Sequence, residues 1–235
     1  MSLIKNRLIA HRGFYKKREI PENSLAAFKE AVKNGYSMEF DINITNDSKI
    51  VVFHDDDLNR LCGVDKKIEE VSSSFLKSLN LYETNEKIPL LEDVLKEVDG
   101  KSELIIEIKK HQNIGILENL LIELLKNYKG SFLICSFDQN ILNWFKTNKV
   151  TLKRGLIFES LPLKFKKYEK FIFLYKYFKS KPDFISLDYK LIESSIFHFC
   201  KAKKIPTIIW TVNSQVLFEK YYDEVDAIIF ENIVV

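Results

Sequence analysis

Short apolar segments alternate with segments of helical periodicity along nearly the whole chain. Apolar runs rich in Ile, Val, Leu and Phe predict buried strands at residues 7–10, 37–43, 50–53, 104–108, 132–136, 154–158, 184–187, 207–211 and 227–230. Apolar residues three and four apart predict helices at 22–33, 91–98, 114–128, 139–147, 190–203 and 214–221, with one helix or a pair between 161 and 180. Such alternation is typical of βαβ units around a parallel sheet.

The predicted strand at 50–53 has to run antiparallel to the strand before it. Only residues 45–49 separate the two, which is too short for a parallel crossover of about a dozen residues. A turn at Asn46 and Asp47 suits such a hairpin. The remaining eight predicted strands favour an α/β fold of the (β/α)8 type, a TIM-like barrel, over a doubly wound sheet.

Length and composition suit a single barrel. The 235 residues, 46% of them hydrophobic, can bury a large core. We predict one domain over residues 1–235, with a small inserted subdomain at approximately 55–88, after the strand hairpin. No internal repeat or linker interrupts this pattern.

Charge and cysteine content exclude several classes of protein. The 36 basic and 33 acidic residues leave a formal charge of +3, without the strong basic excess of a nucleic-acid-binding protein. Three cysteines far apart suit neither a disulfide framework nor a zinc site. We find no apolar run of the roughly 18 residues that span a membrane and no signal-peptide segment. We therefore expect a cytoplasmic protein of unspecified oligomeric state.

Acidic residues gather where predicted strands end. Glu39 and Asp41 are two residues apart, so they share one face of a strand, which in a barrel is the interior near the active-site end. Divalent cations such as Mg²⁺ or Ca²⁺ offset the repulsion between two such carboxylates. Taken alone, the pair is more typical of solvated acids at a strand edge. Glu107 and Lys109 repeat this spacing on a later strand. Glu107 can be a third metal ligand with Lys109 as a phosphate-binding cation, or the two can form a surface ion pair.

Two histidines follow apolar strands and flank the acidic residues. A single histidine there is more often structural, but His11 and His54 together can supply an acid and a base. Arg12 adds a fork-shaped cation that suits phosphate. His111 and His198 have no such neighbours, and we expect structural roles for both.

The segment Pro21–Ser24 is typical of a helix start. It also suits a loop that brings Glu22 or Asn23 to the mouth of the barrel, and both interpretations can hold.

Taken in order, these segments resemble the motifs of glycerophosphodiester phosphodiesterases, and the match covers nearly the whole chain. The motifs are HRG at 11–13, PENS at 21–24, EFD at 39–41, VFHD at 52–55, IPLLE at 88–92, EIK at 107–109 and WTVN at 210–213. The resemblance implies a TIM-like barrel with a small subdomain inserted after the second histidine.

The resemblance also implies roles for individual residues. The metal ligands would be Glu39, Asp41 and Glu107, holding one divalent ion, Mg²⁺ or Ca²⁺. His11 and His54 would be the acid–base pair, in an order that the sequence does not give, and Arg12 and Lys109 would bind phosphate. The expected substrate-binding residues are Glu22, Asn23, Phe137, Trp210 and Phe230, with Phe137 and Trp210 as a wall against the glycerol.

The implied reaction is metal-dependent hydrolysis of glycerophosphodiesters, such as glycerophosphocholine or glycerophosphoethanolamine, to sn-glycerol 3-phosphate and an alcohol. One alternative is an enzyme that acts on lipids, either a lysophospholipase D or a relative of sphingomyelinase D. The insertion between His54 and Glu107 argues against the relative of sphingomyelinase D. A catalytically silent phosphate-binding barrel is another, although no expected catalytic position is lost.

Two features bear on the substrate. Residues 228–232 depart from the family's usual Thr-Asp-x-Pro, and its customary final helix is missing before Val235, so the leaving alcohol stays undetermined. Residues 163–178 interleave lysines with aromatic residues. This segment suits peripheral contact with an anionic membrane, which would admit lysophospholipids, or a barrel helix with its aromatic residues inward.

Overall fold

The computed structural model describes residues 3–233, which fall into two compact units. The N-terminal unit is Ala10–Phe132, and the C-terminal unit combines Met1–Ile9 with Leu133–Val235. Within the described residues, no helix is both long and apolar enough to cross a membrane.

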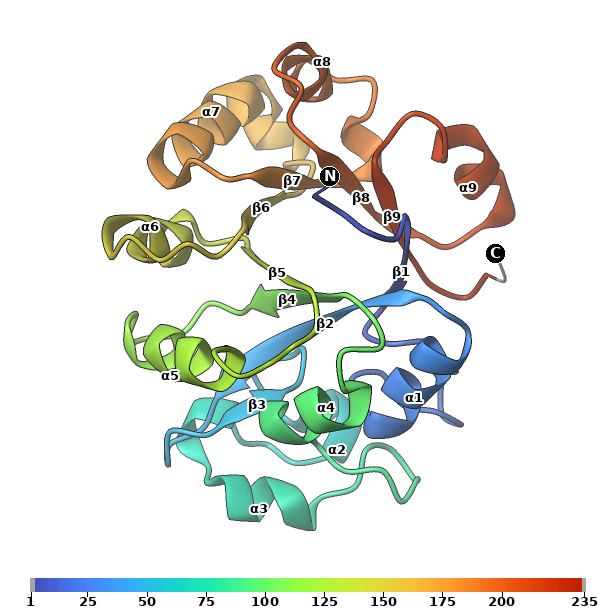
Figure 1. The fold of residues 1–235 in the computed structure, drawn as a ribbon, viewed down its shortest axis with the longest axis vertical. Helices are drawn as coiled ribbons and strands as arrows, with labels where there is room; N and C mark the ends of the chain where they lie inside the picture. The colour runs from blue at the N-terminus through green and yellow to red at the C-terminus, as the bar shows by residue number, and fades with distance from the viewer. Residues whose placement is uncertain (1–2, 234–235) are drawn as a thin grey trace. The chain divides into compact units, whose positions relative to one another are not determined.

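The N-terminal unit is organised around one long buried strand. Its elements are β1 (Leu8–His11, shared with the other unit), α1 (Leu25–Lys33), β2 (Ser37–Ile44), β3 (Ile50–Val52), α2 (Asn59–Cys62), η1 (Ile68–Glu70), α3 (Ser73–Ser78), α4 (Leu91–Val98), β4 (Leu104–Ile108) and α5 (Ile116–Leu125). In Figure 1, α1 and α4 lie side by side below β2.

Strand β2 pairs with a different partner on each side. It runs parallel to β4, with Asp41 opposite Glu107. It runs antiparallel to β3, with Ile42 opposite Val52, which confirms the predicted hairpin. Residues 37–43 are all buried, as in parallel sheets covered on both faces. The polar side chains of this strand are therefore held in a largely dry environment.

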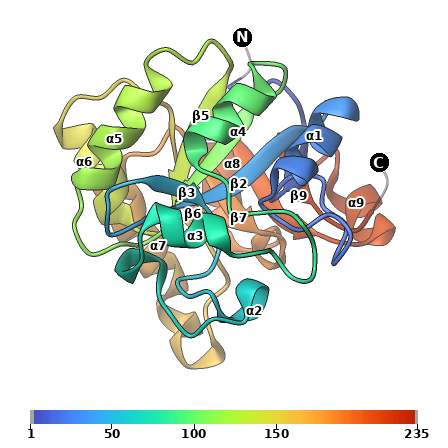
Figure 2. The ribbon, with the colours of Figure 1, turned by 90° about the horizontal axis from the view of Figure 1, so that it is seen from below.

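The inserted segment between β3 and α4 has a small core of its own. Leu58, Leu61, Ile68 and Leu76 are each about 1% exposed or less and cluster with Phe53 at the end of β3. In Figure 2, α3 overlaps β3 in projection and α2 lies below both. The short helices and loops of this segment are thus anchored beside the strand that leads to His54.

The C-terminal unit continues the alternation of strand and helix. Its elements are β5 (Phe132–Ser136), α6 (Gln139–Thr147), β6 (Arg154–Phe158), η2 (Leu163–Tyr168), α7 (Glu169–Ser180), β7 (Phe184–Asp188), η3 (Tyr189–Leu191), α8 (Ser195–Ala202), β8 (Thr207–Val212), α9 (Gln215–Tyr221) and β9 (Ala227–Phe230). From β5 to β9, each strand runs parallel to the next.

Most predicted elements are confirmed within one or two residues. The helix expected at 114–128 is shorter, Ile116–Leu125, and two other helices differ for local reasons. The first helix begins at Leu25 instead of residue 22, because Asn23 has a φ of +57° and Ser24 caps the helix through Ala27 N–H. The helix expected at 190–203 is the turn η3 followed by α8, which Ser194 caps. No helix follows β9 among residues 231–233, the last that the structure describes.

Candidate active site

Three buried carboxylates lie together, two in the middle of β2 and one near the end of β4. Glu39, Asp41 and Glu107 are only 4%, 1% and 8% exposed. One oxygen of each lies within 4.8 Å of the others. Carboxylate oxygens are the ligands that Mg²⁺ and Ca²⁺ prefer. The donors therefore fit one hard divalent cation, as the sequence predicts.

The pKa values of these groups show why a cation suits them. Burial, Asp41 and Glu107 raise the pKa of Glu39 well above its ordinary value. Burial and Asp41 likewise raise the pKa of Glu107. Burial also acts to raise the pKa of Asp41, but the nearby cations, chiefly Lys109, outweigh it and leave that pKa below the ordinary value. Full ionisation of the three carboxylates therefore requires additional positive charge.

Two cationic side chains border the carboxylates. Lys109 Nζ lies 2.8 Å from Glu107 Oε1 and 3.4 Å from Asp41 Oδ1. Arg12 Nε lies 3.6 Å from Asp41 Oδ2. Burial disfavours both charges, but the surrounding carboxylates outweigh it and raise the pKa of each group. Both side chains thus stay charged where they can meet an anion.

The two predicted histidines lie beside this group. His11 Nε2 is 3.9 Å from Glu39 Oε2. His54 Nδ1 lies 2.6 Å from Asp55 Oδ1. A carboxylate that accepts the Nδ1 proton leaves Nε2 as the nitrogen that exchanges a proton with a ligand. The arrangement suits His54 to acid–base chemistry.

The turn Pro21–Ser24 begins α1 and also brings Glu22 and Asn23 to the groups around the carboxylates. Ser24 caps α1, while Asn23 Nδ2 donates a hydrogen bond of 3.0 Å to Asp41 Oδ2. Glu22 Oε1 accepts a hydrogen bond of 2.5 Å from Arg12. Both predicted side chains therefore orient the groups around the carboxylates.

Two further residues hold this site together, and neither was predicted from the sequence. Arg60 donates to Asp55 Oδ2 at 2.7 Å and to both oxygens of Glu22, at 2.7 and 2.9 Å. Asn43 donates to the carbonyl oxygens of Phe53 and Asp55, on either side of His54. Asn43 could have been found, because it continues the alternation of β2. No spacing rule indicates Arg60, which lies in the inserted segment.

The other predicted substrate-binding residues lie in the C-terminal unit. The rings of Phe137 and Trp210 meet edge to face, with centroids 5.5 Å apart. Phe230 is 1% exposed in β9. The role of these three residues in substrate binding stays a prediction.

Comparisons with known proteins identify the family of this chain. Residues 11–234 match the model of the glycerophosphoryl diester phosphodiesterase family. Human lysophospholipase D GDPD1 is 28% identical, over 92% of this chain and 79% of that protein. A glycerophosphodiester phosphodiesterase from Thermotoga maritima is 27% identical, with a TM-score of 0.77 over 97% of this chain and 95% of its own.

A phosphodiesterase from Oleispira antarctica, solved in complex with the product sn-glycerol-3-phosphate, has a TM-score of 0.82 at 23% identity, covering 95% of this chain and 92% of its own. These likenesses confirm the predicted α/β fold class, a (β/α)8 TIM-type barrel. The chain belongs to the glycerophosphoryl diester phosphodiesterase family and is an enzyme of that class.

Proposed function

We propose that this phosphodiesterase hydrolyses small glycerophosphodiesters, such as glycerophosphocholine and glycerophosphoethanolamine, to sn-glycerol 3-phosphate and an alcohol. The observation that carries the proposal is the buried group Glu39, Asp41 and Glu107 with Arg12 and Lys109 beside it. Three carboxylates suit a divalent metal, and the two cations suit the phosphate of a diester. The free cysteines accord with a cytoplasmic location.

The metal-binding residues would be Glu39, Asp41 and Glu107. A bound Mg²⁺ or Ca²⁺ supplies Lewis-acid stabilisation of charge on the phosphoryl oxygens. Arg12 Nε is buried and has no hydrogen-bond acceptor among residues 3–233. A buried donor without a hydrogen bond is costly, and a phosphate oxygen would accept one from it. Lys109 stabilises the same oxygens by charge.

The histidines would move the protons. One takes the proton of the glycerol 2-hydroxyl as that oxygen forms a bond to phosphorus. The other donates a proton to the alcohol oxygen as its bond to phosphorus breaks, which leaves a cyclic phosphate. Water then opens the ring, with the two histidines in exchanged roles.

Glycerol 3-phosphate release tests this proposal. His11→Ala and His54→Ala should each lower kcat/KM by about 10²–10⁴-fold. The exposed His198 gives the matched control, since His198→Ala should leave activity unchanged. Removal of divalent ions by a chelator should abolish hydrolysis, and Mg²⁺ and Ca²⁺ added in turn should identify the ion. Near wild-type activity in either site variant, or in excess chelator, would overturn the proposal.

A second candidate function, action on lysophospholipids at a membrane, is suggested by residues 163–178. Leu163, Phe171 and Phe178 are 93%, 73% and 62% exposed, and Phe165, Tyr168 and Tyr175 are also exposed. The alternative with aromatic residues inward thus holds only for part of the segment, such as the buried Phe173. The human relative's name, lysophospholipase D, accords with a lipid substrate.

The charge of this surface suits an anionic membrane. Lysines occupy positions 164, 166, 167, 170 and 176, whereas Glu169 is the one acidic residue of the segment. Glu169 is buried and pairs with Lys166 at 2.8 Å. Basic surfaces with exposed aromatic side chains bind the interface of anionic bilayers.

Flotation with lipid vesicles tests the membrane contact. The wild-type protein should float with phosphatidylserine-containing vesicles and not with pure phosphatidylcholine. The variant Leu163→Ser/Phe171→Ser/Phe178→Ser should stay in the soluble fraction and keep its activity on glycerophosphocholine. Absence of wild-type flotation with anionic vesicles would exclude this contact.

A further inference from the structure

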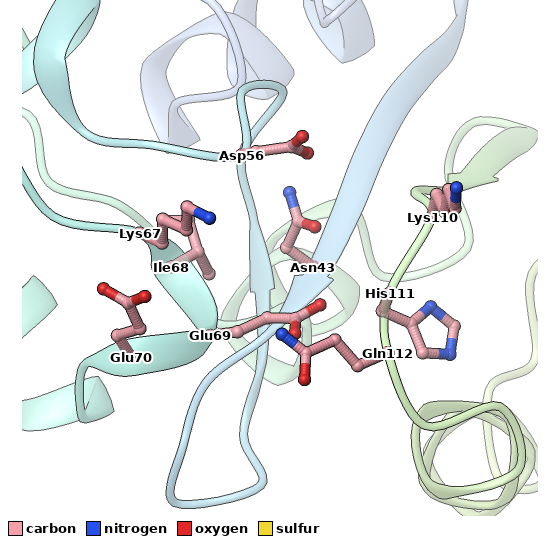
Figure 3. Close-up of a pocket in the computed structure, with 9 residues that line it drawn as sticks. All are labelled: Asn43, Asp56, Lys67, Ile68, Glu69, Glu70, Lys110, His111 and Gln112. Carbon is pink, nitrogen blue, oxygen red and sulfur yellow. The ribbon is translucent and has the colours of Figure 1, made fainter.

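His111 is buried in a loop whose other residues are exposed or half-buried. The loop joins β4 to α5, and of its residues 109–115, all of which the structure describes, His111 alone is buried. The residue contributes to the wall of a cavity of about 320 Å³. Figure 3 shows its ring turned away from Asn43, on the side of α5, and only 2% of the side chain is exposed. The ring therefore faces the protein and not the cavity.

The two nitrogens of this ring contact the two ends of the loop. Nδ1 lies 2.9 Å from the carbonyl oxygen of Lys109. Nε2 lies 3.2 Å from Oε1 of Glu118, in the first turn of α5. Oε2 of Glu118 accepts a hydrogen bond of 2.6 Å from Gly115 N–H. A carbonyl oxygen can only accept, so Nδ1 carries a proton and donates it to Lys109.

Lys109 is the first residue after β4, where the pairing of β4 with β2 ends. Its N–H donates to the carbonyl oxygen of Ile42 at 3.1 Å, and its own carbonyl oxygen accepts from His111. Its ammonium lies 2.8 Å from Glu107 Oε1 and 3.4 Å from Asp41 Oδ1. The peptide groups on both sides of Lys109 are therefore fixed, and with them the start of its side chain.

This fixed backbone matters because lysine reaches a ligand through a flexible four-carbon chain. Glu107 and Asp41 are also expected metal ligands, so they cannot alone fix the ammonium once a cation takes up their charge. The contacts of the Lys109 backbone do not depend on that cation. A displacement of about 1 Å in a group that meets the reacting atoms can cost about 100-fold in rate.

We propose that His111 is a positioning residue of the phosphodiesterase reaction. Its Nδ1–H fixes the backbone of Lys109 so that the ammonium meets the phosphoryl oxygens, and Glu118 fixes the ring. The inference rests on the proposed phosphate-binding role of Lys109. It goes beyond the structural role that the sequence alone indicates for His111, which acts here through Lys109 without touching the substrate.

A double-mutant cycle separates action through Lys109 from a general effect on the fold. His111→Leu should lower kcat/KM on glycerophosphocholine about 10–100-fold, as loss of a residue that orients a functional group does. In the Lys109→Met background, the same substitution should change kcat/KM less than about twofold, because the ammonium that His111 positions is gone. His111→Asn should recover about fivefold or more, since its Nδ2–H is attached to Cγ as Nδ1 is and can donate to the same carbonyl.

A loss of stability has to be separated from a loss of positioning, because His111→Leu leaves Glu118 buried without its partner. The double variant His111→Leu/Glu118→Leu leaves no unpaired charge and should lose as much kcat/KM as His111→Leu. Leu125→Ala is the matched control. This side chain is 3% exposed at the other end of α5, so its loss destabilises the same helix and should leave kcat/KM unchanged below the Tm of the variant.

Binding of inorganic phosphate gives the same cycle without turnover. With Mg²⁺ or Ca²⁺ present, the rise in Tm on adding phosphate measures its Kd. His111→Leu should weaken phosphate binding about 10-fold in the wild type and less than about twofold in Lys109→Met.

The outcomes distinguish this inference from the proposed function. Coupling of His111 to Lys109 in phosphate binding, without hydrolysis of any glycerophosphodiester, would overturn the proposed substrates and support the positioning role. Equal losses with and without Lys109, or full activity of His111→Leu, would overturn that role. So would a His111→Asn variant no better than His111→Leu, or an equal loss of kcat/KM in Leu125→Ala.

Discussion

At the scale of single residues, Arg60 determines how His54 is held. Its guanidinium spans two carboxylates, Asp55 and Glu22, through four hydrogen bonds of 2.7–3.1 Å. Burial acts to raise the pKa of Asp55, but the hydrogen bonds from His54 and Arg60 outweigh it and keep that pKa below its ordinary value. Asp55 therefore stays ionised and keeps the Nδ1 proton of His54 in place.

Arg60→Ala should lower kcat/KM on glycerophosphocholine by about 10–100-fold, as loss of a residue that orients a catalytic group does. Arg60→Lys should recover only part of this, because one ammonium cannot make paired hydrogen bonds to two carboxylates. The exposed Arg18 provides the control, Arg18→Ala. Steady-state kinetics check the prediction, and equal activity of Arg60→Ala and wild type would contradict it.

At the scale of elements, the features that could be predicted are those set by strand periodicity. Glu39 and Asp41 share a strand face because side chains alternate, and the position of Glu107 is set by parallel pairing of β2 with β4. Arg60 and Asp56 lie in an inserted segment of short helices and loops. Their positions depend on the packing of Leu58 and Leu61 beneath them, which no periodic pattern encodes.

The end of β1 packs against α1 so closely that Gly13 has no room for a side chain. A Cβ there would lie 2.9 Å from Ala27 Cβ and 3.0 Å from Phe28 Cδ1, at a φ of +77°. Gly35 has a similar φ of +72°, but a Cβ there would meet nothing within 4 Å. The two glycines therefore separate the cost of backbone strain from the cost of a clash.

Gly13→Ala should destabilise the protein by about 2–5 kcal/mol, from backbone strain and overpacking together. Gly35→Ala should cost only the strain, about 1 kcal/mol. Urea unfolding of both variants measures the difference. Equal losses at the two positions would show that α1 moves away from β1 at no cost.

The loop after β4 is tied to α5 by a buried ion pair. His111 Nε2 lies 3.2 Å from Glu118 Oε1, and His111 Nδ1 lies 2.9 Å from the carbonyl oxygen of Lys109. The Nδ1–H group donates to that carbonyl oxygen, and a proton on Nε2 adds a positive charge beside Glu118. Burial acts to lower the pKa of His111, but Glu118 and the carbonyl oxygen of Lys109 outweigh it and raise that pKa.

This raised pKa gives the stability of the loop a pH dependence. Unfolded histidine titrates near pH 6.5. The His111–Glu118 ion pair therefore contributes fully to the free energy of unfolding below about pH 6.5, and this contribution is lost as the pH rises through the higher folded pKa. The free energy of unfolding of the wild type should exceed that of Glu118→Gln by about 1.5–3 kcal/mol at pH 6, and by less at pH 9. Urea unfolding at both pH values checks this, and a margin independent of pH would contradict it.

At the scale of the whole molecule, the groups expected to bind the metal and phosphate and move the protons all lie in Ala10–Phe132. The fold class could be predicted because short apolar runs alternate with segments of helical periodicity. The positions of residues in the inserted segment could not, because they depend on the packing of short helices and loops and not on a periodic pattern. Because the three carboxylates lie in one unit, the change in the free energy of unfolding on adding metal reports on the predicted carboxylate site.

Divalent metal should stabilise the protein increasingly as the pH rises. Without metal, burial and the neighbouring acids raise the pKa of Glu39 and Glu107, so the folded state keeps protons that the unfolded state releases near pH 4.5. Metal-free stability thus falls as the pH rises through these folded pKa values, whereas metal binds the ionised carboxylates. The gain in Tm from Mg²⁺ or Ca²⁺ should be small at pH 5 and reach the equivalent of about 2.7 kcal/mol at pH 8 with metal at 100 times its Kd.

Glu39→Gln should raise the metal-free Tm at pH 8 and remove most of the gain in Tm from metal. The control Glu92→Gln, at an exposed position, should change neither quantity. A gain that is equal at both pH values, or that survives Glu39→Gln, would place the metal elsewhere.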